Sequence, residues 1–249
     1  MKVLGFDTAT SATTVALLDT DSDDAVHRRD DPPAGARPRH TTRLMALVVD
    51  VLGAAGVEWG DVDRIAVGVG PGTFTGLRIG VATAQALARA REIELVGVST
   101  LHALARGAIT EEAGADGAAR DGLDDAVMAV IDARRGEVFA AGWAAADLAR
   151  TGAAPAVVPR ALRPGALADT MRSDGRPWLA VGDGAVEFRE ALEHAGARIP
   201  EPDSQLHRVS AVEHCRLALA LQPGAPEGVQ PEYLRLPDAE INLRTARQQ

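Results

Sequence analysis

Two segments of the chain share one pattern, in which a strand ends at an acid, a tight turn follows, and a second strand runs back. In residues 2–19 the acid is Asp7, and in residues 127–143 it is Asp132. The small and polar residues at both bends favour a turn, and the apolar runs beside them favour strands. A chain that repeats a hairpin in this way is expected to contain two related lobes.

Alternating strands and helices follow the first hairpin. A third strand is predicted near 26–28, followed by a helix over 40–55, a strand over 64–69, a helix over 77–90, a strand over 95–98 and a helix from Ser99 or Thr100. Three strands followed by alternating helices and strands predict an α/β lobe with a mixed sheet.

The second half repeats this kind of organisation. After its hairpin we predict a strand over 178–181, a helix that ends at His194, a helix over 209–221 and a short strand over 231–235. A surface loop is expected over 111–125 and a frayed tail from Asn242. We therefore divide the chain into an N-terminal lobe, residues 1–105, to which helix 209–221 returns, and a C-terminal lobe, residues 106–249.

Composition narrows the functions open to a chain of 249 residues. Hydrophobic residues make up 46% of it and aromatic residues 3%, so Ala, Val and Leu must fill the core. The formal net charge is −9 and Lys2 is the single lysine, which argues against independent binding to a nucleic-acid backbone. If the protein acts on RNA, we expect another subunit to hold the RNA.

No targeting or membrane segment is expected. The apolar runs are far shorter than the roughly twenty residues that a membrane span requires. An acid as early as Asp7 does not fit a signal peptide. Cys215 is the single cysteine and lies in an apolar run, so it is expected to be a core residue rather than half of a disulfide. We expect a cytoplasmic protein.

Residues 66–80 look at first like a phosphate-binding loop. The stretch reads Ala-Val-Gly-Val-Gly-Pro-Gly-Thr-Phe-Thr-Gly-Leu-Arg-Ile-Gly and lies between a predicted strand and a predicted helix. It lacks the Gly-Lys-Ser/Thr ending of such a loop and the glycine spacing of a dinucleotide fold. The glycines alone leave the role of this stretch open.

Two of the predicted helices lack a polar face. Eight of the nine residues from 44 to 52 are apolar, and residues 79–88 carry no charge. Gly76, Gly80 and Ala84 recur every four residues, and they are expected to form a flat face that another helix can approach closely. Such helices either lie enclosed within one lobe or are covered by a second chain, and the pattern leaves both readings open.

Five motifs that span nearly the whole chain resemble those of the TsaB (YeaZ) family, and they fall in the family's order. They are Val-Leu-Gly-Phe-Asp-Thr-Ala-Thr at 3–10, Gly-Val-Gly-Pro-Gly-Thr-Phe-Thr-Gly-Leu-Arg-Ile-Gly at 68–80, Gly-Val-Ser-Thr-Leu at 97–101, Ile-Asp-Ala-Arg-Arg-Gly-Glu-Val-Phe at 131–139 and Pro-Glu-Tyr-Leu-Arg at 231–235. The resemblance implies an α/β fold of two actin-like or sugar-kinase-like lobes. It also implies a role in placing a threonylcarbamoyl group on the adenosine next to the anticodon, in tRNAs that read codons beginning with adenine.

The resemblance further implies partners. A TsaD-like catalytic subunit would pair with this chain, a TsaE-like ATPase would join the larger complex, and tRNA would be reached only through that complex. In the family the two helices without a polar face build the pairing surface, and we expect the isolated chain to form a homodimer through them at high concentration. The residues expected at the partner interface are Leu44, Met45, Val48 and Leu52 of the first helix and Gly76, Gly80, Thr83, Ala84 and Leu87 of the second.

The same comparison argues against a metal centre. The catalytic paralogue carries two histidines four residues apart, which bind a metal from one side of a helix. Aligned from Gly97, the corresponding positions here are Thr100 and Leu104, and His102 is out of step with both. We expect no metal site.

Nucleotide binding is expected to be weak or absent, so no cofactor is predicted. Asp7 keeps the acid of the first phosphate hairpin, but the second loop is reduced to Gly182-Asp183-Gly184, whose carboxylate repels a phosphate. Residues 66–80 are then a structural turn, with Pro71 fixing the bend. The sequence therefore predicts a non-catalytic subunit. The alternative is an autonomous enzyme of the same fold, an ATP-dependent kinase or a metallopeptidase.

Overall fold

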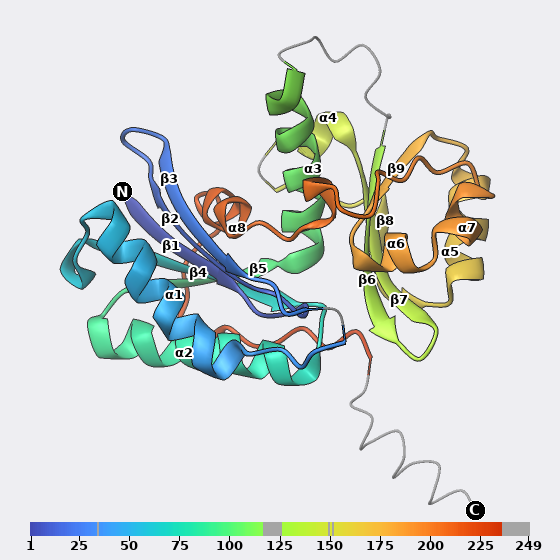
Figure 1. Cartoon of the computed structure of the whole chain (residues 1–249). Coiled ribbons are helices and arrows are strands. Elements are labelled where there is room, and N and C mark those ends of the chain that lie inside the picture. Colours follow the sequence, from blue (N-terminus) through green and yellow to red (C-terminus); the bar gives the residue numbers. More distant parts are fainter. Residues whose placement is uncertain (34, 117–125, 149, 151, 236–249) are drawn as a thin grey trace, which may run out of the picture.

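The structure is a computed structural model that describes residues 1–33, 35–116, 126–148, 150 and 152–235. The described residues form two lobes that lie side by side, each built on one sheet with helices against its faces (Figure 1). Among the described helices, none combines the length and the apolar character that crossing a lipid bilayer demands.

The sheet of the first lobe is mixed, as predicted. Its strands are β1 (Lys2–Asp7), β2 (Thr13–Asp19), β3 (Asp24–Asp30), β4 (Arg64–Gly70) and β5 (Glu94–Ser99), in the order β3-β2-β1-β4-β5. The hairpin strands pair antiparallel, whereas β4 and β5 join the far side of β1 in parallel. The parallel connections require crossovers, which the helices between these strands provide.

Helices cover both faces of this sheet (Figure 1). On one face lie α1 (His40–Ala55) and α2 (Phe74–Arg91), and on the other lie α3 (Thr100–Asp116) and α8 (Ala211–Ala218). Alternate side chains of β1 point to opposite faces, so Leu4 and Phe6 pack under α1 and α2 while Val3 packs against α8. The first lobe is therefore a three-layer sandwich.

The second lobe repeats the strand order of the first. Its strands β6 (Ala126–Arg134), β7 (Glu137–Ala144), β8 (Val157–Leu162) and β9 (Trp178–Val181) lie in the order β8-β7-β6-β9, which matches β3-β2-β1-β4. The sheet packs against α3 on one face and against α5 (Pro164–Asp174), α6 (Asp183–Glu187) and α7 (Arg189–Glu193) on the other, and α4 (Ala145–Leu148) follows β7. The repeated order confirms two related lobes with mixed sheets.

The last described segment, residues 224–235, runs back along the first lobe and is called here the C-terminal segment. It begins near the short helix η3 (Pro226–Gly228) and lies beside α2, where the side chain of Gln85 donates to the carbonyl of Val229 at 2.8 Å. The amide of Glu232 donates to the carbonyl of Val69 at 2.7 Å. The strand predicted over 231–235 is wrong, because this single ladder-like bond does not extend into a strand.

The remaining expectations have different outcomes. The surface loop over 111–125 is helical as far as Asp116, and its remainder, like the tail from Asn242, lies outside the described residues. The elements that were not predicted are strand β8, helices α4 and α5, and the short helices η1 (Trp59–Asp61), η2 (Gln205–His207) and η3. The division after residue 105 stays a prediction, because α3 contacts both sheets.

Candidate functional site

The acid of the first hairpin points into the protein. The side chain of Asp7 is 1% exposed. Its Oδ1 accepts the amide of Ala9 at 2.6 Å, and its Oδ2 accepts the hydroxyl of Thr100 at 2.7 Å. The same Oδ2 lies 2.9 Å from Nε2 of His214, which α8 carries in from the second half of the chain. The chain's own groups therefore occupy both oxygens of this carboxylate.

The surroundings of Asp7 keep it ionised. Burial by itself acts to raise the pKa of Asp7, because a carboxylate is poorly solvated in the interior. The hydrogen bond and charge of His214, together with the Ala9 amide and the Thr100 hydroxyl, outweigh burial and hold the pKa below its ordinary value. The other ring nitrogen of His214 lies 2.9 Å from the carbonyl oxygen of Ser210. His214 was missed at the sequence level, because a lone histidine far along the chain gives no signal of this contact.

The glycine-rich stretch packs against the turn between β1 and β2. A Cβ placed at Gly76 would lie 1.9 Å from the carbonyl oxygen of Thr8, and one at Gly80 would lie 2.4 Å from the Thr8 hydroxyl. That hydroxyl donates to the carbonyl of Gly76 at 2.7 Å. A Cβ at Gly72 would meet the carbonyl oxygen of Ala9 at 2.4 Å. Because these glycines lack a side chain, the turn of the chain's own first hairpin can pack directly against them.

The second loop is also bonded within the chain, although its acid, Asp183, is exposed. The amide of Gly182 donates to Nδ1 of His207 at 3.1 Å, and Oδ1 of Asp183 accepts the amide of Asp132 at 3.0 Å. A cavity of about 180 Å³ lies between this loop and Thr10 of the first hairpin, and its lining includes Asp183 and Asp31. Arg29 lines the cavity as well and pairs with Asp31 at 2.8 Å, so the charges of this cavity do not by themselves favour a phosphate group.

The two positions that correspond to the metal-binding histidines of the catalytic paralogue make other contacts here. Thr100 bonds Asp7, and Leu104 is fully buried in the core between the lobes. His102 stacks on Trp143 with ring centroids 5.1 Å apart, and burial lowers its pKa to about 4. Within the described residues, no group of three or more His, Cys, Asp or Glu side chains is placed to hold a metal ion.

Most of the residues expected at the partner interface lie inside the lobe. The buried ones are Leu44, Val48 and Leu52 of α1 and Gly76, Gly80 and Ala84 of α2. Their side chains cannot contact another chain, which corrects the expectation that the small residues form a flat outer face. That face meets Thr8 and the sheet instead. Met45 is 39% exposed, and Thr83 and Leu87 are half-buried.

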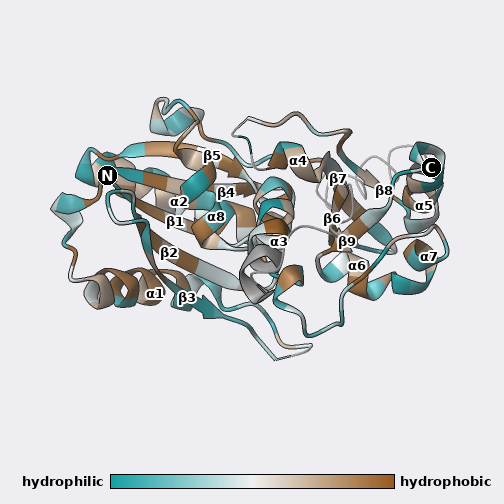
Figure 2. Cartoon of the chain, turned by 90° about the horizontal axis from the view of Figure 1, so that it is seen from above, coloured by the Kyte–Doolittle hydropathy of each residue, from teal (hydrophilic) through white to brown (hydrophobic). Residues whose placement is uncertain are grey.

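The exposed side of the two helices is nevertheless apolar. On α1 it carries Met45, Ala46 and Val49, and Val49 is 61% exposed. On α2 it carries Ala82 and Ala86. These five residues are called the outer face. Figure 2 shows mostly hydrophobic and neutral colours along α1. Ala46, Val49, Ala82 and Ala86 were missed because an all-round apolar helix does not reveal which side faces outward.

Charged residues stand only at the borders of the outer face. Asp50 of α1 pairs with Arg28 of β3 at 2.8 Å. On α2, Arg78 and Arg89 lie one turn before Ala82 and one turn after Ala86. An apolar centre with charges around it is the usual composition of a protein interface.

Comparisons with known sequences match the chain to a TsaD family model and to curated TsaB proteins. The sequence model of the family described as "TsaD: tRNA N6-adenosine threonylcarbamoyltransferase" matches residues 31–170. The "tRNA threonylcarbamoyladenosine biosynthesis protein TsaB" of Escherichia coli (strain K12) is 33% identical over 239 residues, covering 94% of this chain and 95% of the relative. The protein of the same name from Bacillus subtilis (strain 168) is 29% identical, covering 96% of each chain.

Solved structures give the same result. A Pseudomonas aeruginosa protein described as similar to peptidase YeaZ superposes with a TM-score of 0.73 at 30% identity, covering 94% of this chain and 99% of that one. YeaZ from Pseudomonas aeruginosa superposes with a TM-score of 0.70 at 27% identity, covering 93% and 100%. The fold expected from the motifs is thus confirmed. On sequence and fold together, the chain belongs to the TsaB (YeaZ) family.

Proposed function

We propose that this chain is a non-catalytic, cytoplasmic subunit of the machinery that forms threonylcarbamoyladenosine in tRNA. In this proposal it pairs with a TsaD-type transferase, and a TsaE-type ATPase joins the larger assembly. Relatives in Escherichia coli and Bacillus subtilis are named for this pathway, which supports the proposal. The match of residues 31–170 to the TsaD family supports it too. Two chains of related fold can pair through equivalent surfaces, as the two halves of a symmetric dimer do.

The enclosed state of Asp7 supports a non-catalytic role. A catalytic acid must reach a reacting group directly or through one water molecule. Asp7 instead bonds Ala9 and Thr100 and is enclosed beside His214. Asp183 of the second loop is exposed, and its Oδ1 accepts the amide of Asp132. The function we infer is therefore to bind and support another subunit.

The observation that carries the proposal is the outer face. Met45 and Val49 are the large exposed apolar side chains of α1, and Ala82 and Ala86 continue the surface on α2. An apolar surface at the centre of two neighbouring helices gains free energy when a partner removes it from water. Small side chains on α2 allow a partner helix to approach closely.

A matched pair of substitutions tests this proposal. Val49 and Val158 are exposed to nearly the same degree, 61% and 62%, but Val158 lies on β8 of the other lobe. Val49→Glu should abolish co-purification with a TsaD-type subunit, because the interface would bury an unpaired charge. Val158→Glu should leave pairing intact. Both variants should keep their stability within about 0.5 kcal/mol, as exposed substitutions generally do.

Two results would contradict the proposal. One is unchanged pairing of the Val49→Glu variant, and the other is equal loss of pairing in both variants. The isolated chain is expected to self-associate through the same face at high concentration, and sedimentation of the Val49→Glu variant should show a monomer. Calorimetry with ATP and magnesium tests the alternative of an autonomous enzyme, for which the proposal predicts no heat of binding.

A further inference from the structure

Arg78 stands at the border of the outer face, in the first turns of α2. It is exposed and lies one turn before Ala82 on the same side of the helix. Any chain that covers Ala82 and Ala86 therefore also comes within reach of the Arg78 guanidinium.

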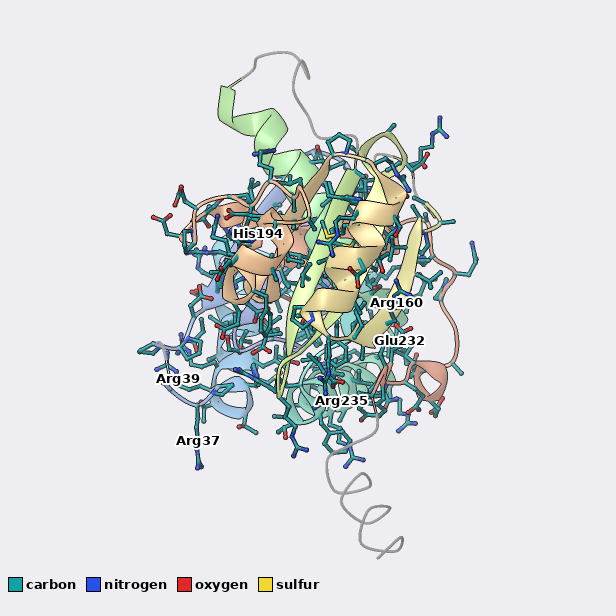
Figure 3. The ribbon with its side chains drawn as sticks, turned by 90° about the vertical axis from the view of Figure 1, so that its right-hand side faces the viewer. Arg37, Arg39, Arg160, His194, Glu232 and Arg235 are labelled. Atoms are coloured by element: carbon teal, nitrogen blue, oxygen red, sulfur yellow. The ribbon has the colours of Figure 1, made fainter. Side chains whose placement is uncertain are left out.

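Two aromatic rings fix the position of this guanidinium. Its central carbon lies 4.0 Å from the centroid of the Phe74 ring, one turn earlier on α2. Its Nε donates to the hydroxyl of Tyr233 at 3.4 Å, and the Phe74 and Tyr233 rings lie 5.2 Å apart between centroids. Tyr233 comes from the C-terminal segment, and Figure 3 shows its neighbours Glu232 and Arg235 in the lower half of the molecule. A side chain stacked in this way loses less entropy on binding than a free arginine does.

The other arginines around the outer face already have carboxylate partners. Arg28 pairs with Asp50, Arg43 with Asp30 and Arg89 with Glu227. No carboxylate among the described residues pairs with Arg78. Its terminal N–H groups are therefore available for a planar, two-pronged acceptor.

We propose that Arg78 is a specificity-determining contact of the partner interface and that it donates two hydrogen bonds to an Asp or Glu side chain of the partner subunit. This inference rests on the proposed function, because it assigns the chemistry of the partner at the same surface. Stacked arginines beside aromatic residues are frequent among the residues that dominate binding energy. A partner with an acidic side chain at the rim of an apolar helical surface fits both the guanidinium of Arg78 and the apolar outer face beside it.

A protein carboxylate fits this place better than a phosphate of RNA. Arg78 lies in line with Ala82 and Ala86, so the surface on that side of it is apolar. The chain as a whole carries a formal net charge of −9, which repels a nucleic-acid backbone. We therefore make RNA contact an outcome of the test and not part of the proposal.

The test compares dissociation constants for the purified TsaD-type subunit by calorimetry. Arg78→Ala should weaken pairing about 30-fold or more, the range of a residue that dominates an interface. Arg78→Lys keeps the charge but not the planar fork, so it should lose most of the same affinity. Arg89→Ala is the matched control on the same helix, and it should change affinity by less than about threefold because Arg89 is engaged by Glu227.

Two further variants examine the position of the guanidinium. Phe74→Ala removes the ring under Arg78 and should weaken pairing about tenfold, whereas Tyr233→Phe keeps the ring contact and should have little effect. Arg78→Gln retains most of the aliphatic stem and replaces the alanine variant if that variant proves unstable.

Several outcomes would overturn the inference. They are full affinity of Arg78→Lys, equal effects of Arg78→Ala and Arg89→Ala, or unchanged pairing with weaker tRNA binding by the assembled complex. If Val49→Glu abolishes pairing and Arg78→Ala does not weaken it, the inference fails while the proposed function stands. If the unaltered chain does not bind the TsaD-type subunit, both fail.

Discussion

Oδ2 of Asp7 lies 2.9 Å from Nε2 of His214, and both side chains are almost completely enclosed. The contact joins the end of β1 to α8, a helix that returns from the second half of the chain. The same carboxylate also binds Thr100 at the start of α3. The acid of the first hairpin thus fastens two helices to the sheet.

Asp7→Asn should therefore destabilise the protein at neutral pH. Removing one member of a buried pair costs about 3–5 kcal/mol, because the remaining polar group stays unpaired. The pKa of Asp7 is lowered in the folded state, so its contribution is fully present above the unfolded pKa of about 3.9 and is lost as pH falls below it. Urea denaturation from pH 7 to pH 3 should show the difference between variant and parent shrinking below about pH 4. Equal stability of the two proteins at pH 7 would refute this role.

Gly76→Ala and Gly53→Ala make the same change in two helices with opposite expected signs. A Cβ at Gly76 would lie 1.9 Å from the carbonyl oxygen of Thr8, so α2 must shift, and the free energy of unfolding should fall by about 2–3 kcal/mol. A Cβ at Gly53 meets nothing within 4 Å, and alanine should add about 0.5–1 kcal/mol of helix stability. Thermal unfolding measures both, and a harmless Gly76→Ala would refute the packing account of the glycine stretch.

His102 should make the protein less stable as the solution becomes mildly acidic. Burial, with the nearby charge of Arg106, lowers the pKa of His102 to about 4, below its unfolded value of about 6.5. Its contribution is therefore present above pH 6.5 and is lost as pH falls toward 4. Because the ring is partly exposed, we expect the loss to be about 1–2 kcal/mol.

His102→Phe checks this prediction, since phenylalanine keeps the stack on Trp143 but cannot bind a proton. The variant should lose less stability than its parent between pH 6.5 and pH 4. Burial also lowers the pKa of His40, so part of the acid sensitivity should remain in the variant. Superimposable pH profiles would argue that His102 is not protonated on unfolding in this range.

The helices and strands whose apolar residues recur with one clear spacing were predictable from the sequence. The helix over 40–55 begins and ends as predicted, and β2 and β9 match their predicted bounds. In contrast, β8 was missed because it is half-exposed and contains Pro159, which gives little alternation. The predicted strand over 231–235 failed for a different reason. It has the residues of a strand, but no neighbouring strand edge pairs with it beyond the bond from Glu232 to Val69.

The site was only partly predictable, because the missing information concerned orientation. The sequence showed that α1 and α2 lack a polar side, but Ala and Gly are equally suited to the core and the surface, so they do not mark the outward side. Burial places Gly80 and Ala84 inward and Ala82 and Ala86 outward. The contact of Asp7 with His214 depends on the path of the whole second half, which no local pattern records.

The central claim is that the outer face is the surface that another subunit covers, and thiol labelling tests it directly. Cys215 is buried, and burial raises its pKa to about 12, so the native thiol should not react. A cysteine introduced by Ala86→Cys should react in the free chain and be protected when a TsaD-type subunit is added, whereas one introduced by Val158→Cys should react equally in both states. Equal labelling at position 86 with and without the bound partner, or protection at position 158 alone, would contradict the account.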